Sequence, residues 1–214
     1  MPQLKFILNP SYDWEVFRSF RKGQGFKLHK EIKTREDFLA VYRKLRPFLT
    51  GSRAVYQAAW DEINDFFFRY VERLTKHPWK FKKYYCVLSP FHKGVSNWGE
   101  NRIIRSWAEN PYTQRKITAH ELLITHLWDY LDRHGYKNLS DESKWAFCEI
   151  TAWAIAGLEE KLIKKCWPWI AESERWPLRH NYPQLVGLQK KIRPLYERRS
   201  SFKSYTEKAL RVIS

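Results

Sequence analysis

A histidine followed directly by a glutamate, His120-Glu121, has the residue types best suited to chemistry in this sequence. In a helix, two histidines four residues apart share one face and can bind a single zinc ion, while a glutamate beside the first takes a proton from the metal-bound water. The position four residues after His120 is Ile124, and the next histidine is His126. Six residues turn a helix by about 600°, which leaves His126 roughly 120° away from His120 around the axis. A regular helix therefore does not bring both histidines to one metal ion.

Glu149 is the second candidate ligand, because it lies in the middle of an apolar helical stripe. That stripe consists of Trp145, Cys148, Ala152 and Ala156. A carboxylate on a buried helix face needs a partner or a metal ion. We therefore interpret His120 and Glu149 as candidate zinc ligands and Glu121 as the candidate general base.

Each of these residues also has a purely structural interpretation. His120 can be an ordinary helical histidine, and Glu121 can simply complement the helix dipole. Glu149 can pair with a buried arginine or with His120 itself. If a further ligand replaces the missing histidine, the residues that can supply it are His126, the possible substitute on the same helix, and the more distant His92 and His180.

The elements that must position these residues are expected to be helices. Thr113 is expected to cap a helix that runs to about His134, with Gly135 as its C-terminal stop. Ser140 is expected to cap a second helix over residues 141–165. The candidate ligands would then lie on two successive helices.

The rest of the chain adds further helices and three short strands. Helices are expected over residues 34–46, 52–76, 183–199 and 204–213, with an interruption at Pro47 and Gly51. Strands are expected over residues 4–8, 83–88 and 102–107. Residues 11–33 are expected to form a loop with a helical piece, and residues 167–182 an irregular cover. This order predicts a predominantly helical α+β fold with a small antiparallel sheet packed on helices.

Two motifs together resemble the gluzincin branch of the zincin metallopeptidases. The segment Ala-His-Glu-Leu-Leu at residues 119–123 and the pattern Trp145-x-x-x-Glu149 are similar to those of the minigluzincins and related zinc peptidases. The resemblance implies a zincin-like core over about residues 77–158, followed by a helical C-terminal extension over about residues 183–214. It also implies zinc as the cofactor.

Carried over by position, the resemblance makes His120 and Glu149 zinc ligands and Glu121 the general base. Ile124 stands where these proteins have their second histidine, and a catalytic zinc usually keeps three protein ligands. The resemblance therefore implies a zinc metallopeptidase-like domain, and we favour a degenerate, non-catalytic member. An active one would be a zinc-dependent peptidase that uses Glu121 on a peptide substrate.

Length and cysteine content suit a single domain in a reducing compartment. The 214 residues are 43% hydrophobic, which is enough for one core. The three cysteines are odd in number and form no C-x-x-C pair, so a cytoplasmic location is the expectation. The N-terminus shows no signal-peptide pattern, and no apolar run reaches the roughly 18 residues of a transmembrane helix.

A net charge of +16 supports an alternative function as a basic binding module for nucleic acid or another acidic partner. The basic clusters lie at residues 21–33, 73–83 and 190–203, where aromatic residues are interleaved with them. Such mixtures can contact phosphates and stack on bases. This alternative would use the helical tail and is compatible with a core that has lost catalysis.

Overall fold

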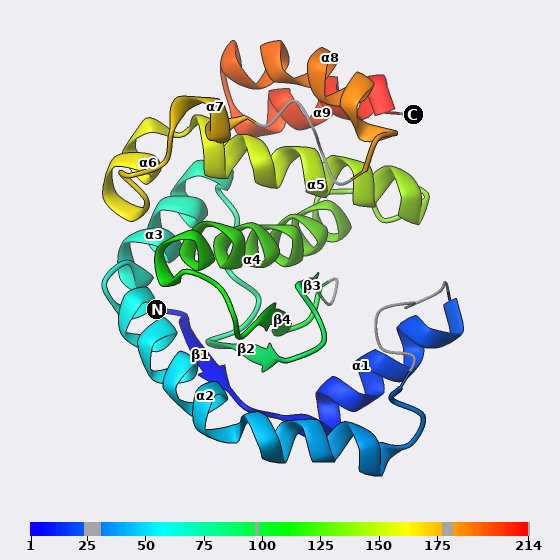
Figure 1. Cartoon of the computed structure of the whole chain (residues 1–214). Coiled ribbons are helices and arrows are strands. Elements are labelled where there is room, and N and C mark those ends of the chain that lie inside the picture. The colour runs from blue at the N-terminus through cyan, green and yellow to red at the C-terminus, as the bar shows by residue number, and fades with distance from the viewer. Residues whose placement is uncertain (24–30, 97–98, 177–181, 214) are drawn as a thin grey trace.

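The computed structural model describes residues 1–23, 31–96, 99–176 and 182–213 (Figure 1). Its strands are β1 (Gln3–Ile7), β2 (Lys83–Ser89), β3 (Gly94–Ser96) and β4 (Arg102–Ser106). The long helices of the first half are α1 (Pro10–Gly23), α2 (Arg35–Asp61) and α3 (Asn64–Thr75). The later helices are α4 (Pro111–Arg133), α5 (Asp141–Leu158), α6 (Glu160–Cys166), α7 (Glu172–Arg175), α8 (Leu185–Glu197) and α9 (Phe202–Ile213). The predicted α+β, predominantly helical fold is confirmed.

The sheet is mixed, so the expectation of a wholly antiparallel sheet is corrected. Its strand order is β1-β2-β4-β3. The pairs β1–β2 and β2–β4 are parallel, and only the edge strand β3 runs antiparallel to β4. The physical reason is the connection: three helices separate β1 from β2, and parallel strands need a long crossover of this kind.

Helix α4 occupies the centre of the molecule, between the sheet and α5, and α8 and α9 lie on the far side of α5 (Figure 1). Sixteen residues of α4 are buried. A helix that is covered on nearly all sides must bury polar residues as well as apolar ones. The side chains of α4 that can do chemistry are therefore held inside the fold and not on its surface.

The ends of the two central helices follow from their caps. Asn110 accepts a hydrogen bond from the Tyr112 N–H, and Pro111 occupies the first turn, so α4 begins two residues before the predicted cap at Thr113. The predicted stop after His134 is confirmed, because Gly135 takes the left-handed φ of +90°. The predicted cap at Ser140 is also confirmed, since its side chain accepts from the Ser143 N–H.

The predicted interruption at Pro47 and Gly51 is wrong, because α2 runs through both residues. Proline removes one hydrogen bond inside a helix. Here Pro47 and Gly51 lie on the exposed side of α2, while Leu49 and Tyr56 are buried on the other side. Tertiary packing of that buried face outweighs the local cost. The real break follows Asp61, before α3.

The predicted helix over residues 141–165 is interrupted at Glu159, which has extended φ and ψ of −81° and 95°. Its carboxylate accepts hydrogen bonds from the hydroxyls of Tyr70 and Tyr196, both at 2.5 Å, and also pairs with Arg199. These three contacts hold Glu159 toward α3 and α8. They supply the physical reason for ending α5 and starting α6, which no sequence signal marks.

The remaining predictions mostly agree with the structure. The strands at residues 4–8, 83–88 and 102–107 and the helices at 183–199 and 204–213 correspond to β1, β2, β4, α8 and α9. The short strand β3 was not predicted. Residues 11–33 contain α1, and the predicted irregular cover contains α7; the intervening residues 24–30 and 177–181 lie outside the described part of the chain. Throughout the described ranges, no helix has the combined length and apolar character required to cross a bilayer.

Candidate functional site

His120 on α4 and Glu149 on α5 meet where the two helices pack side by side (Figure 1). Nε2 of His120 lies 3.0 Å from Oε2 of Glu149. Both side chains are nearly buried, with exposed fractions of 6% and 9%. The structure therefore brings together the two residues that the sequence analysis selected as metal ligands, while their role as ligands stays a prediction.

The imidazole of His120 is enclosed by Trp153, which lies one helical turn after Glu149 on α5. The two ring centroids are 4.6 Å apart. Nδ1 of His120 is buried and has no hydrogen-bond partner among the described residues. A proton on Nε2 suits this arrangement, because Nε2–H can donate to the Glu149 carboxylate.

The geometry of the pair bears on zinc binding. Nε2 of His120 and Oε2 of Glu149 are at hydrogen-bond distance, 3.0 Å apart. A zinc-bound histidine usually donates its other ring N–H to a partner, and Nδ1 of His120 has no acceptor within the described residues. The described ranges also contain no group of three or more His, Cys, Asp or Glu side chains placed to hold a metal.

Ile124 follows His120 by one helical turn and therefore lies on nearly the same face of α4. It is 1% exposed and belongs to the main hydrophobic core. A histidine here would be placed to become the second ligand of one metal ion with His120. The apolar isoleucine instead fills the space with packing contacts.

His126 lies away from the His120–Glu149 pair, as its angular position on α4 predicts. Its Nε2 is 3.0 Å from the hydroxyl of Thr75, and its ring lies tilted against Trp79 at a centroid distance of 4.3 Å. Burial, and next the neighbouring His77, lower the pKa of His126 well below its ordinary value. His126 therefore has a structural environment of its own and does not line the pocket beside Glu149.

Of the other two histidines considered as substitutes, the structure describes only His92. His92 is buried elsewhere, with its Nε2 3.7 Å from Oδ1 of Asp13 on α1. His180 lies outside the described residues.

Arg105 joins the candidate general base to a second carboxylate. Its Nη2 contacts both carboxylate oxygens of Glu109, at 2.7 and 2.6 Å, and its Nη1 lies 3.8 Å from Oε1 of Glu121. The Arg105 side chain is only 4% exposed, and that of Glu121 is 12% exposed. One buried cation therefore balances two carboxylates, as the burial of charge requires. The carboxylate of Glu121 faces this guanidinium.

Gly94 at the start of β3 leaves the space that this ion pair occupies. A Cβ atom at residue 94 would lie 2.7 Å from Oε1 of Glu121 and would also overlap Nη1 of Arg105. The absence of a side chain allows the edge strand to approach α4 closely. The short strand β3, which the sequence analysis missed, is thus a wall of the site.

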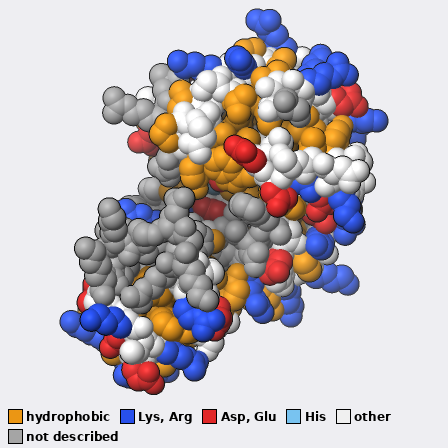
Figure 2. Space-filling model, turned by 90° about the vertical axis from the view of Figure 1, so that its right-hand side faces the viewer, with side chains coloured by type: hydrophobic (Ala, Val, Ile, Leu, Met, Phe, Trp, Pro, Cys, Tyr) orange, Lys and Arg blue, Asp and Glu red, His pale blue; other side chains and the backbone are white. Residues whose placement is uncertain are grey.

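A pocket of about 320 Å³ opens beside the two groups. Its lining residues come from β3, β4, α4, α5 and the segments that flank them: Lys93, Gly94, Arg105, Glu109, Ile117, His120, Glu121, Glu149, Trp153 and Tyr182. On the side of the molecule seen in Figure 2, the surface is hollowed between an upper part with a broad hydrophobic area and a lower part, and acidic side chains are visible in and beside the hollow.

Arg105 is the functional candidate that sequence reasoning missed. It is an arginine within an otherwise apolar strand, Arg-Ile-Ile-Arg-Ser, and a buried arginine needs carboxylate partners. That signal can suggest an ion pair, but it does not identify Glu109 and Glu121 as the partners. The arrangement can bind polar groups through charge and hydrogen bonds.

The whole chain has no detectable relative among known proteins. Neither protein-family models, nor curated proteins, nor solved structures include a match to this sequence or fold.

Proposed function

We propose that this chain is a gluzincin-like, metallopeptidase-related domain in which a direct His120–Glu149 bond has replaced the metal ion. In this proposal the domain no longer hydrolyses peptides. The observation that carries it is the 3.0 Å contact between the imidazole of one central helix and the carboxylate of the next.

The order of the surrounding elements supports the kinship with gluzincins. The helix that carries His120 and Glu121 is preceded by strands, and the following helix carries Glu149, as in the proteins that the sequence resembles. The edge strand β3 passes close to Glu121, because Gly94 has no side chain. A histidine, three glutamates and an edge strand thus surround one pocket, which unrelated helical packing would not require.

Three features support the loss of catalysis. Ile124 occupies the position of a missing ligand, Nδ1 of His120 has no partner within the described chain, and Glu121 faces Arg105. A general base must reach the water that it activates. Among the described residues the pocket offers two candidate zinc ligands, and the Glu121 carboxylate faces a guanidinium. We infer that this arrangement does not support zinc-dependent hydrolysis.

Restoring the missing ligand tests this proposal. Ile124→His should raise the zinc affinity by roughly 10-fold or more over that of the wild-type protein, because it would add a third ligand to His120 and Glu149. Affinity is measured by competition with a chromophoric chelator. Ile124→Val is the matched control, since it changes the same buried position without adding a ligand. The gain should disappear when Glu149→Gln is combined with Ile124→His.

Two outcomes would overturn the proposal. One is zinc-dependent cleavage of a fluorogenic peptide library by the wild-type protein. The other is an Ile124→His protein that shows no gain in zinc affinity. If the buried histidine loosens the fold, a zinc-dependent rise in melting temperature still reports binding, because a ligand specific for the native state stabilises it.

A further inference from the structure

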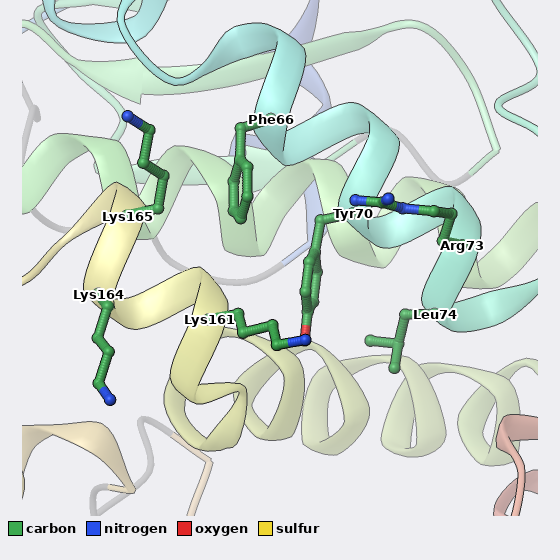
Figure 3. A pocket seen from close by; sticks show the side chains of 7 residues that line it. All are labelled: Phe66, Tyr70, Arg73, Leu74, Lys161, Lys164 and Lys165. Carbon is green, nitrogen blue, oxygen red and sulfur yellow. The ribbon is translucent and has the colours of Figure 1, made fainter.

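A second concave surface lies between α3 and α6, away from the site described above. We name it the α3–α6 groove; it measures about 640 Å³, within the size range of ligand sites. Figure 3 shows the side chains that line it, which are Phe66, Tyr70, Arg73, Leu74, Lys161, Lys164 and Lys165. Four come from α3, three of them as an apolar row together with Arg73, and three lysines come from α6.

The floor of the α3–α6 groove is aromatic. Phe66, Tyr70 and Leu74 are spaced by four residues on α3 and therefore lie along one face of that helix. The rings of Phe66 and Tyr70 are stacked, with centroids 5.7 Å apart and an angle of 24° between their planes. All three side chains are only partly buried, so part of their apolar surface is open to solvent.

A hydrogen bond to the interior of the fold fixes the position of Tyr70. Its hydroxyl donates a 2.5 Å hydrogen bond to Glu159, and Glu159 is in turn paired with Arg199. The negative charge of Glu159 is therefore balanced by Arg199. A ligand in the groove meets an aromatic surface that is already ordered, which lowers the entropic cost of binding.

The rim of the groove is cationic. Arg73, Lys161, Lys164 and Lys165 are all exposed, and none of the residues described as lining the groove is acidic. In Figure 3, Lys161 extends toward the Tyr70 hydroxyl, while Lys164 and Lys165 extend away at the outer side of α6. Four positive charges around one groove repel one another, and a polyanion would relieve this repulsion.

We propose that the α3–α6 groove binds single-stranded nucleic acid. Exposed aromatic faces and a row of cations are the two features that such binding combines, because bases stack on the rings and phosphates contact the lysines and arginine. A duplex would offer phosphates but would keep its base faces hidden. An acidic peptide would use the cations but would gain nothing specific from the aromatic floor. This proposal is independent of the metal-site proposal.

Fluorescence anisotropy with labelled oligothymidylate, at several salt concentrations, tests the cationic rim. The triple variant Lys161→Gln, Lys164→Gln and Lys165→Gln should bind at least about 10-fold more weakly, and the slope of log affinity against log salt should shrink by about 2. The matched control is Lys190→Gln, Lys191→Gln and Lys203→Gln, which removes the same charge from exposed residues of the helical tail. The control should retain most of the affinity.

Abasic oligonucleotide of the same length tests the aromatic floor. Phe66→Leu should lower affinity for oligothymidylate by roughly 5-fold or more and leave binding of the abasic strand unchanged. The proposal is overturned if the tail control weakens binding as much as the groove variant, or if duplex or polyglutamate competes as well as the single strand. It is also overturned if wild type does not bind. The lysine variants concern exposed side chains only, so their result stands even if Phe66→Leu perturbs folding.

Discussion

Glu149 lies 3.0 Å from His120 although the two residues are 29 positions apart and belong to different helices. Both side chains are nearly buried, and each gives the other a hydrogen-bond partner. Without that partner, burying the polar group would cost free energy. A bond to an ionised partner contributes roughly 1.5–3 kcal/mol to stability. The pair is therefore a structural link between α4 and α5 as well as the centre of the candidate site.

A double-mutant cycle on this pair should show strong coupling. His120→Ala should cost about 2–3 kcal/mol, because it leaves a buried carboxylate without its donor. Glu149→Gln should cost less, since the amide oxygen can still accept from Nε2–H. Urea denaturation of both single variants and of the double variant measures the coupling energy. Additive effects would show that the two side chains do not interact in solution.

Arg105 should be among the side chains whose loss destabilises the protein most. Arg105→Met leaves Glu109 and Glu121 without their shared buried cation and should cost about 3–5 kcal/mol in free energy of unfolding. Arg193→Met is the matched control, because Arg193 and Glu197 form a pair with both side chains 44% exposed. That control should cost less than about 1 kcal/mol. Equal effects would indicate that Arg105 is solvated.

Two glycine-to-alanine substitutions should change stability in opposite directions. Gly94→Ala places a methyl group against Arg105 and Glu121 and should destabilise the protein by about 1–3 kcal/mol. Gly51 lies on α2, and a Cβ atom added there would have no atom within 4 Å. Gly51→Ala should therefore stabilise the protein by about 0.5–1 kcal/mol. Thermal melts compare the two. A neutral Gly94→Ala would mean that β3 can move away from α4 without cost.

The buried carboxyl of Asp13 predicts a pH dependence of stability. Burial raises the pKa of Asp13 from 3.8 to about 7, against the smaller lowering effect of hydrogen bonds from Tyr42 and Ser89. Between these two pH values the native state holds a proton that the unfolded chain has released, so the free energy of unfolding falls as pH rises from about 4 to about 7.

Asp13→Asn removes this titration. The variant should show a flatter pH profile over that range and should be the more stable protein above pH 7, by an amount on the order of a few kcal/mol. Urea denaturation at a series of pH values measures it. His92, whose Nε2 is 3.7 Å from Asp13, also faces this carboxyl. If the variant and the wild-type protein have parallel profiles, Asp13 is ionised in the native state.

Local signals in the sequence predicted most of the helices and the angular relationship on α4. Helical periodicity separates His126 from His120, and the structure places His126 against Thr75 and Trp79. The buried stripe on α5 marked Glu149 as a carboxylate in need of a partner. These predictions depend only on spacing along one helix, which is why they could be made without a structure.

Contacts between distant segments could not be predicted in the same way. The break at Glu159 arises from Tyr70, Tyr196 and Arg199, which lie far from it in sequence. The continuation of α2 through Pro47 depends on the packing of its buried face. A local pattern describes the cost of a proline in a helix but not the tertiary contacts that offset it.

Elemental analysis of the wild-type protein, purified from zinc-supplemented cultures, tests the central claim most directly. If His120 and Glu149 are bonded to each other in place of a metal ion, the zinc content should be far below one ion per chain and should be the same in Glu149→Gln. One zinc per chain in the wild-type protein, lost in Glu149→Gln and in His120→Ala, would contradict the account.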